Sequence, residues 1–455
     1  MLKMKRKHFE FKIYLVFVIC MILIVNLFVI RIVTASNVTP MSVGQTIKVS
    51  QNYELGDVLD RDGNVIVKGS GHNVVWNSSE TEDAFQDILG IDISKTLGSR
   101  TTVLGNCFWV FGTEDNRFTL NNLLHPNERR IGGGVRLTMD KKLQEYICSL
   151  IADNEYENAY ILVSNYKTGE ILAVYGEVFS NSFHPGSTLK PILAAAALTL
   201  NPEFINYTYN CTSNNHNFQT EDGPIKINCV NEISHGNLNM SDAMAYSCNG
   251  YYISLLQHTD KAAMLDTLKK WGFDTTISYQ QFMYWDHSFV GNSEKQTDYL
   301  LAAIGQSNAY ITPAGLNFCT NALLNHGELV EPIWFTQKKV SDNSKWDPIK
   351  GSSIKRVCSS EVADQVVGMM EAVTEKGTGK SFYIPKFAAK TGTAQKADEN
   401  GDLTGLYTLW TTGGLIDEEN PYSVTVCLDN VTEEVTSAET GKIAQNILLY
   451  LAGGE

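Results

Sequence analysis

The stretch PGSTLKP, residues 185–191, begins an apolar run that continues to Leu200 and includes four consecutive alanines. Such a run predicts a buried helix that starts just after the Pro-Gly pair. Ser187 would then lie at the helix N-terminus, where free N–H groups and the helix dipole favour a developing negative charge. Lys190 follows one turn later on the same face, within hydrogen-bond reach of the serine hydroxyl. The stretch therefore predicts a serine nucleophile activated by a lysine.

A second string, Ser247-Cys248-Asn249, supplies a further hydroxyl and an amide. An unperturbed lysine titrates near ~10.4, so Lys190 can act as a base only where burial or a nearby cation favours its neutral amine. The hydroxyl of Ser247 can then relay the proton to a leaving nitrogen, and the amide of Asn249 can bind a substrate amide. The structural alternative for this string is a helix N-cap.

A third string, Lys390-Thr391-Gly392-Thr393, fits an edge strand of a sheet. Gly392 lets a peptide approach the backbone, while Lys390 and Thr393 offer donors to a substrate carboxylate. The backbone N–H groups of Ser187 and Thr393 would then form the oxyanion hole. The string is therefore interpreted as the substrate-binding part of the site.

Other matches to these short strings are interpreted as structure. Ser164 and Lys167 fall in a predicted strand and turn, where positions three apart point to opposite faces. His184 precedes the nucleophile by three residues, but the sequence indicates no carboxylate to orient it. The GTGKS run at 377–381 ends like a phosphate loop but lacks the required earlier glycine and a preceding buried strand, so nucleotide binding is rejected. The remaining matches lie in a turn or in polar loops, at 167–169, 341–343 and 352–355.

Strand-like runs flank a helical middle in the later part of the chain, which predicts an α+β fold with helices packed on an antiparallel sheet. The expected strands after the first 140 residues are 160–163, 170–174, 387–393, 406–411 and 422–428. Besides the helix that follows Ser187, the expected helices are 143–151, 240–256, 360–373 and 443–451. Three glycines at 132–134 mark the boundary with a smaller N-terminal block.

The N-terminus predicts a membrane anchor. Five cationic residues occupy the first twelve positions, and the eighteen residues 13–30 carry no charge. A helix of that length almost crosses a ~30 Å hydrocarbon layer, and the basic cluster should remain cytoplasmic. We therefore expect a cytoplasmic tail, a transmembrane anchor, an N-terminal pedestal domain and an extracytoplasmic catalytic domain, at 1–12, 13–34, 35–134 and 135–455. A cleavable signal peptide is the alternative.

Composition limits the partners. The formal net charge of −14 argues against a nucleic-acid partner. The nine cysteines show no CxxC pair and no metal-type Cys/His spacing, so we expect no metal ion and no cofactor. An extracytoplasmic location permits disulfides, and Cys211 with Cys229, which flank a polar loop, is the best candidate pair. Two free thiols are the alternative.

The three strings together resemble the class B penicillin-binding proteins, membrane-anchored D,D-transpeptidases of bacterial cell-wall synthesis. The resemblance covers most of 135–455. The segment 56–63 is similar to the pedestal motif of that family, although Leu55 stands where an arginine is usual, and LWTTG at 409–413 departs from the usual pattern. Further matching motifs are LTMD at 137–140, TGEILA at 168–173, HG at 235–236, GQ at 305–306, TP at 312–313, GTG at 377–379 and AKTGTA at 389–394.

This resemblance implies a serine β-lactamase/transpeptidase-like domain, in which an antiparallel sheet packed with helices adjoins an all-helical part. A small pedestal and one transmembrane helix would complete the chain. Ser187 would be acylated by the D-Ala-D-Ala end of a peptidoglycan stem peptide, and a neighbouring stem amine would resolve the acyl-enzyme into a cross-link. The resemblance makes Lys190 the base, Ser247 the proton relay and Asn249 a substrate contact, with Lys390 and Thr393 on the substrate carboxylate.

The same resemblance implies partners and a location. β-Lactams would acylate the same serine, and other wall-synthesis membrane proteins would be partners in a process that determines cell shape. The chain would be a single-pass protein of the cell membrane with its catalytic domain outside. Two alternatives stay open: a hydrolase, either a D,D-carboxypeptidase or a serine β-lactamase, and a non-catalytic β-lactam sensor or scaffold. The anchor and pedestal favour the transpeptidase over a secreted β-lactamase.

Overall fold

The computed structural model divides into two compact units, Met1–Ile47 and Lys48–Glu455. The fold below is that of the second unit. Within the described ranges, no helix combines the length and the apolar character of a membrane span. The expected tail at 1–12 and anchor at 13–34 lie outside the described residues, apart from Met21. The structure describes residues 56–70, 73–89, 133–154, 156–212, 216–229, 233–278, 284–339, 345–349, 353–398 and 402–453, with Met21 and the short strands β1 (Ile47–Lys48), β2 (Tyr53–Glu54), β6 (Thr96–Leu97) and β7 (Arg130–Ile131).

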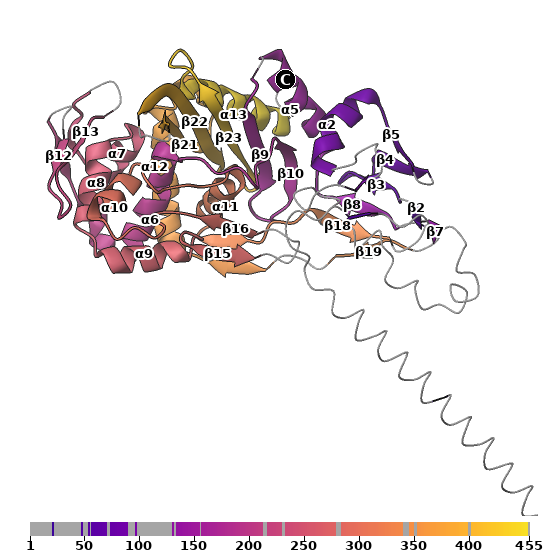
Figure 1. The fold of residues 1–455 in the computed structure, drawn as a ribbon, viewed down its shortest axis with the longest axis horizontal. Helices are drawn as coiled ribbons and strands as arrows, with labels where there is room; N and C mark the ends of the chain where they lie inside the picture. Colours follow the sequence, from indigo (N-terminus) through magenta and orange to yellow (C-terminus); the bar gives the residue numbers. More distant parts are fainter. Residues whose placement is uncertain are drawn as a thin grey trace, which may run out of the picture. The chain divides into compact units, whose positions relative to one another are not determined.

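A five-stranded antiparallel sheet organises the catalytic region (Figure 1). Its strand order is β10-β9-β23-β22-β21, so β21 forms one edge, as the KTGT string predicts. The α+β fold class and all five expected strands are confirmed. The strands are β9 (Ala159–Asn165), β10 (Ile171–Tyr175), β21 (Phe387–Ala397), β22 (Leu403–Leu415) and β23 (Tyr422–Val431).

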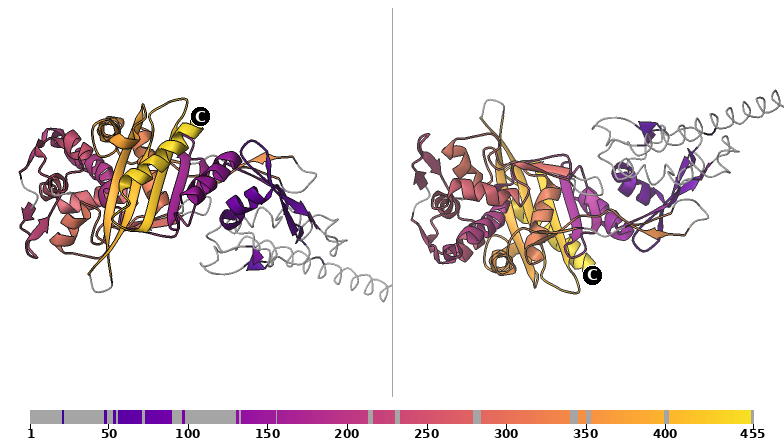
Figure 2. Two further views of the ribbon diagram at one scale, coloured as in Figure 1. Left: turned by 90° about the horizontal axis from the view of Figure 1, so that it is seen from above. Right: turned by 90° about the horizontal axis from the view of Figure 1, so that it is seen from below.

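Helices cover both faces of this sheet, because its strands alternate buried side chains between the two sides. On one face, α5 (Lys141–Asp153) and α13 (Ser437–Leu451) pack their apolar residues against Val424, Val426 and Leu428 of β23 (Figure 2). On the other face lies α11 (Pro313–Leu324), whose residues are all buried. The Asp140 side chain caps α5 by accepting from the N–H groups of its first turn.

The all-helical part adjoins the β21 edge. One correction concerns the helix expected at 240–256, which is two helices with a break at Ser247. The backbone at Ser247 is left-handed, with φ of 57°, and cannot continue a helix. The helices of this part are α6 (Lys190–Leu200), α7 (Met240–Ala245), α8 (Asn249–Gln257), α9 (Lys261–Lys269), α10 (Gln296–Ala302) and α12 (Ser360–Glu375).

Short antiparallel strand pairs lie between these helices. Two of the pairs belong to the segment between α6 and α7, which contacts Asn249. The strands are β11 (Tyr209–Cys211) with β14 (Gly236–Leu238), β12 (His216–Phe218) with β13 (Ile225–Ile227), β15 (Thr275–Ser278) with β16 (Tyr284–His287), and β17 (Glu328–Val330) with β20 (Ile354–Arg356).

A six-stranded sheet joins the N-terminal block to the catalytic region. Its order is β19-β18-β8-β3-β4-β5, so it combines strands from before and after residue 134. The domain boundary at that residue remains a prediction. Residues 56–63, which resemble the pedestal motif, contain a short strand and a turn, in which the Asp60 side chain accepts from two backbone N–H groups. The strands are β3 (Val58–Leu59), β4 (Val65–Ser70), β5 (Asn73–Trp76), β8 (Val135–Leu137), β18 (Phe335–Lys338) and β19 (Asp347–Pro348), followed in the block by α2 (Ser79–Leu89).

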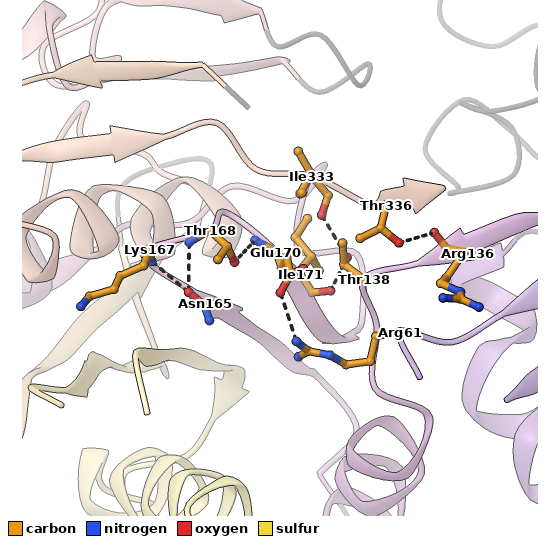
Figure 3. A network of polar contacts seen from close by, with 10 residues as sticks. All are labelled: Arg61, Arg136, Thr138, Asn165, Lys167, Thr168, Glu170, Ile171, Ile333 and Thr336. Atoms are coloured by element: carbon orange, nitrogen blue, oxygen red, sulfur yellow. Dashed lines mark hydrogen bonds and ion pairs between the residues drawn. The ribbon is translucent and has the colours of Figure 1, made fainter. Parts of the chain in front are cut away.

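Polar contacts fasten this sheet to the catalytic region (Figure 3). The Thr138 hydroxyl donates to the carbonyl of Ile171 at 2.6 Å and lies 3.0 Å from that of Ile333. Arg61 forms an ion pair with Glu170 at 3.1 Å. These contacts connect four segments that are far apart in the sequence, so the two regions are joined by hydrogen bonds and an ion pair as well as by the chain itself.

Candidate active site

Ser187 lies in a short 3₁₀ helix, Gly186–Leu189, that leads directly into α6. The backbone N–H of Lys190 donates to the Ser187 carbonyl, which places the lysine one turn after the serine, as predicted. Ser187 is buried, with 8 % of its surface exposed. Its 3₁₀ helix is anchored by the Thr188 hydroxyl, which donates to the Pro185 carbonyl at 2.7 Å.

Close backbone packing fixes this 3₁₀ helix between two other segments. Gly186 has φ of 55°, and a Cβ there would lie 2.7 Å from the carbonyl oxygen of Thr393. Gly305 also has a positive φ, and a Cβ there would lie 2.1 Å from the carbonyl oxygen of Gly186. Both positions therefore need glycine, which brings the backbone beside Ser187 against the third string.

The Lys190 amine is fully buried and has three oxygen neighbours. Its Nζ lies 2.7 Å from the Ser247 carbonyl, 2.8 Å from Asn249 Oδ1 and 3.2 Å from the Ser247 hydroxyl. Burial lowers the pKa of Lys190 to about 8, although the Cys248 and Cys229 thiols oppose the shift. All three of these oxygens can accept hydrogens from the Lys190 amine.

The Ser247 hydroxyl lies between two lysines, because Lys390 Nζ is 3.1 Å away on its other side. Lys390 is also fully buried, and burial followed by the charge of Lys190 lowers its pKa well below the usual value. Two amines and one hydroxyl thus form a continuous path for protons. The positive φ of Ser247 makes this possible by directing both its carbonyl and its hydroxyl toward Lys190.

Asn249 is bound from both ends of its amide. Its oxygen accepts from Lys190, and its Nδ2 donates to the Asn228 carbonyl at 2.9 Å. It begins α8, with Cys248 as the N-cap residue that makes no side-chain capping bond. The alternative reading of this string as a simple helix cap is therefore wrong for Ser247 and Asn249, whose side chains meet Lys190 instead.

The third string occupies the exposed edge of the sheet. Lys390 and Thr391 are buried, whereas the Thr393 side chain is exposed. A Cβ on Gly392 would lie 2.8 Å from the Pro185 carbonyl, so this glycine permits close contact with the nucleophile's segment. The structure therefore brings residues of all three strings together.

Two further contacts were not predicted as parts of the site. The hydroxyl of Thr378 lies 2.7 Å from that of Thr391, and a Cβ on the preceding Gly377 would lie 2.1 Å from the Ala245 carbonyl. The GTG motif at 377–379 thus connects β21 to the end of α7. The Tyr252 ring lies 5.4 Å from Lys190 Nζ. The GTG motif was noticeable from its glycines, whereas nothing in the sequence marks Tyr252.

The rejected alternatives have structural roles. His184 Nδ1 bonds the Ala309 carbonyl at 2.9 Å, and burial lowers its pKa, so it is held by backbone rather than by a carboxylate. The Ser164 hydroxyl donates to Asn317 at 2.6 Å beneath α11, and Lys167 pairs with Glu418. The other matches, at 341–343 and at Ser352, lie outside the described residues.

The candidate disulfide is not formed. Cys211 and Cys229 are both free, buried thiols, and each lies 3.5 Å from His216 Nε2 rather than bonded to the other.

Comparison with known proteins adds independent findings. Residues 159–449 match a family model described as the penicillin-binding protein transpeptidase domain. The chain is 25% identical over 339 residues to stage V sporulation protein D of Bacillus subtilis, covering 66% of this chain and 50% of the relative. It is 26% identical over 339 residues to a peptidoglycan D,D-transpeptidase FtsI homolog of Mesostigma viride, covering 64% and 56%. The chain thus spans about half the length of these curated relatives.

Solved structures share the fold. Penicillin-binding protein 3 of Mycobacterium tuberculosis, complexed with aztreonam, superposes with a TM-score of 0.69 at 18% identity, covering 88% of this chain and 95% of that chain. PBPA of the same organism superposes with a TM-score of 0.73 at 16% identity, covering 88% and 99%. At these identities the likeness establishes the fold alone. The chemistry has to be inferred from the residues of the site.

Proposed function

Since the chain belongs to the penicillin-binding protein transpeptidase family, we propose that it is a peptidoglycan D,D-transpeptidase of the class B type. The observation that carries this proposal is the Ser247 hydroxyl, which lies between the buried amines of Lys190 and Lys390, with Lys190 one helical turn after Ser187. Such a bridge supplies proton transfer without a histidine or a carboxylate. It therefore supports acyl transfer through Ser187.

In the first half of the reaction, the Ser187 hydroxyl attacks the carbonyl of the penultimate D-alanine of a stem peptide. The neutral Lys190 amine takes the hydroxyl proton as the Oγ–C bond forms, and the C–N bond to the terminal D-alanine breaks. Ser247 passes the proton to the leaving nitrogen, which departs as free D-alanine. In the second half, an amine of a neighbouring stem attacks the ester, loses a proton along the same path and leaves Ser187 restored.

The edge strand would hold the substrate. A donor peptide that lies along β21 can form backbone hydrogen bonds with it, and Gly392 leaves room for that approach. Thr393, exposed on the strand, and the amine of Lys390 would donate to the terminal carboxylate, with Thr391 held in place by Thr378. The N–H groups of Ser187 and Thr393 would polarise the reacting carbonyl, and Asn249 would contact the peptide.

The location and the domain division belong to the same proposal. We propose a cytoplasmic tail at 1–12, a membrane anchor at 13–34, a pedestal at 35–134 and the transpeptidase domain at 135–455. The charge-free segment 13–30 after a basic cluster supports the anchor. An extracytoplasmic catalytic domain would meet its substrate at the wall, beside the membrane proteins that supply it, and its inhibition by β-lactams would disturb cell shape.

Covalent labelling tests the nucleophile. The full chain in detergent is incubated with a fluorescent penicillin, digested and analysed by mass spectrometry over several hours. A lasting adduct on the Ser187 peptide is expected. Ser187→Ala should abolish the label, while Ser164→Ala, at another serine followed three residues later by lysine, should retain it. A label that survives Ser187→Ala contradicts the choice of nucleophile.

Product analysis separates transfer from hydrolysis. The full chain is supplied with a pentapeptide donor and an amine acceptor, and the products are identified by mass. The transpeptidase should release D-alanine and form the cross-linked peptide. Release of D-alanine with only a shortened peptide would indicate a carboxypeptidase, rapid loss of the penicillin adduct a β-lactamase, and an adduct without any peptide product a sensor or scaffold.

A further inference from the structure

A group of soft ligands surrounds the second string. The side-chain atoms of Cys211, Cys229, Cys248 and His235 all lie within 4.8 Å of one another. The four residues come from separate places in the fold. Cys211 ends β11, Cys229 follows β13 by two residues, His235 directly precedes β14, and Cys248 is the N-cap of α8. Since the chain between them runs through two strand pairs, the fold rather than local spacing brings these ligands together.

The distances fit a tetrahedral metal site. The Cys229 and Cys248 sulfurs are 3.8 Å apart, and the Cys211 sulfur is 3.4 Å from His235 Nδ1. A tetrahedral zinc ion with bonds of about 2.3 Å to sulfur and about 2.05 Å to nitrogen has S···S edges of about 3.8 Å and S···N edges of about 3.5 Å. A disulfide requires sulfurs about 2.05 Å apart, so the arrangement matches a bridging metal rather than a bond.

The surroundings favour thiolates. The three cysteines are 2 % exposed or less, so they are shielded from solvent at one point of the fold. The backbone N–H groups of Asn249 and Gly250 hydrogen-bond to the Cys229 sulfur. Those N–H groups belong to the start of α8, and a helix N-terminus stabilises a thiolate.

His216 has the geometry of an outer partner. Its Nε2 lies 3.5 Å from the sulfurs of both Cys211 and Cys229, and its Nδ1 lies 2.8 Å from the Tyr209 hydroxyl. With that hydroxyl donating to Nδ1, the Nε2 carries the hydrogen and donates to the sulfurs. Outer partners of this kind orient ligands and tune metal affinity.

We propose that one structural Zn²⁺ ion is bound by Cys211, Cys229, Cys248 and His235. Through Cys248, the ion would hold the backbone at Ser247 in place. Three thiolates and one imidazole in a closed tetrahedron are the ligand set of a structural zinc site. The site goes beyond the proposed reaction, because none of its four ligands has a role in that reaction. The expected effect of the zinc ion on acylation rests on the proposed function, whereas the existence of the zinc site does not.

The position of Cys248 gives the ion a specific role. This residue lies between Ser247 and Asn249, the two side chains that bond Lys190. Ser247 holds a left-handed backbone that a non-glycine residue disfavours. A metal bond to Cys248 would tie this turn to the strand pairs of the preceding segment. Loss of the ion should therefore loosen the proton relay without removing any group from it.

Metal binding is tested directly on the full chain in detergent under reducing conditions. We expect one zinc per chain by elemental analysis. After chelation and exchange into Co²⁺, we expect the intense visible bands of tetrahedral cobalt and a thiolate-to-cobalt charge-transfer band. No bound metal after exposure to Zn²⁺, a cobalt spectrum without thiolate bands, or a disulfide between any two of the three cysteines in an unreduced peptide map would overturn the proposal.

Variants assign the ligands. Cys229→Ser and His235→Ala should each weaken zinc binding by at least ~100-fold, and His216→Asn by roughly 10- to 100-fold. Cys148→Ser is the matched control, since its thiol belongs to α5 and lies outside the cluster, and it should retain one zinc. If Cys148→Ser loses zinc equally, or Cys229→Ser retains it, the assignment fails. The cobalt spectrum of the unaltered chain decides the matter should a variant not fold.

Labelling by penicillin separates this proposal from the enzymatic one. Zinc removal should slow acylation of Ser187 several-fold, and added zinc should restore the rate. If the chain binds zinc but penicillin does not label it, the metal site stands and the proposed function falls. If labelling proceeds normally on a chain that binds no metal, the proposed function stands and the metal site falls.

Discussion

Lys390 and Ser247 meet at one hydrogen bond, yet the chain holds them in place by different means. Lys390 belongs to β21, which pairs with β22 along almost its whole length, from Phe387 to Ala397. Ser247 lies in a short break between α7 and α8, where its carbonyl and hydroxyl are bound by lysine side chains. Regular backbone pairing therefore fixes one half of the site, and side-chain contacts fix the other. Substitutions should separate the two halves.

The largest effect is expected in the half held by side chains. Ser247→Ala removes the hydroxyl between the two amines and should lower the rate of penicillin acylation by ~10²- to 10⁴-fold. Thr393→Ser keeps a hydroxyl on the edge strand and should change the rate only a few-fold. Stopped-flow measurement of the acylation rate constant checks both. A loss below about tenfold for Ser247→Ala would show that Lys190 works without the relay.

A smaller effect should come from the backbone contact behind the nucleophile. Gly305→Ala places a Cβ 2.1 Å from the Gly186 carbonyl at a positive φ, and should lower the free energy of unfolding by about 1–3 kcal/mol. Gly368→Ala is the control, since a Cβ at this position in α12 meets nothing within 4 Å and should stabilise the helix by roughly 0.5–1 kcal/mol. Urea titration measures both; equal effects of the two substitutions would contradict the close packing.

The acylation rate and the free energy of unfolding should both depend on pH, because both halves of the site contain a buried amine. Acylation should accelerate as the pH rises through the Lys190 pKa of about 8 and level off above it, since the neutral amine is the base. Between that value and the ordinary lysine pKa, the unfolded chain binds more protons than the folded one, so the free energy of unfolding should rise with pH. Lys390 contributes in the same direction. A flat rate profile across this window would exclude Lys190 as the base.

The smallest effect concerns the strained turn itself. Ser247→Gly and Ser247→Ala both remove the hydroxyl, but glycine accepts a φ of 57° without penalty. The glycine variant should therefore be more stable than the alanine variant by about 1 kcal/mol, with similar losses of acylation. Thermal unfolding of the two variants gives the comparison. Greater stability of the alanine variant would mean that the turn relaxes when the hydroxyl is lost.

The sequence predicts the regular half of the molecule well. The five strands of the central sheet, the edge position of the KTGT string and the buried helix after Ser187 follow from apolar periodicity and from glycine and proline. The side-chain half is different. Residues 240–256 carry an apolar pattern that predicts one helix, and the break at Ser247 arises because bonds to Lys190, distant in sequence, replace the helical bonds there.

The cysteines show the same limit. Cys211, Cys229 and Cys248 are separated by long intervals, and His235 lies between the last two, so no metal-binding spacing is visible. Only the folding of the strand pairs β11–β14 and β12–β13 brings them together. The pairing expected for Cys211 and Cys229 failed for this reason, because proximity along a loop says little about which sulfurs meet. Gly305 was likewise visible as a motif residue, but not as the contact of Gly186.

The six-stranded sheet combines strands from the beginning of the chain with strands made much later, which affects how the chain folds during synthesis. β8 lies between β3, made early by the ribosome, and β18, made after most of the catalytic helices. The emerging N-terminal half must therefore wait with an unpaired edge until β18 arrives, and unpaired edges attract other strands. Correct maturation would depend on the pace of synthesis, and a fragment that ends before β18 should aggregate rather than behave as an independent module.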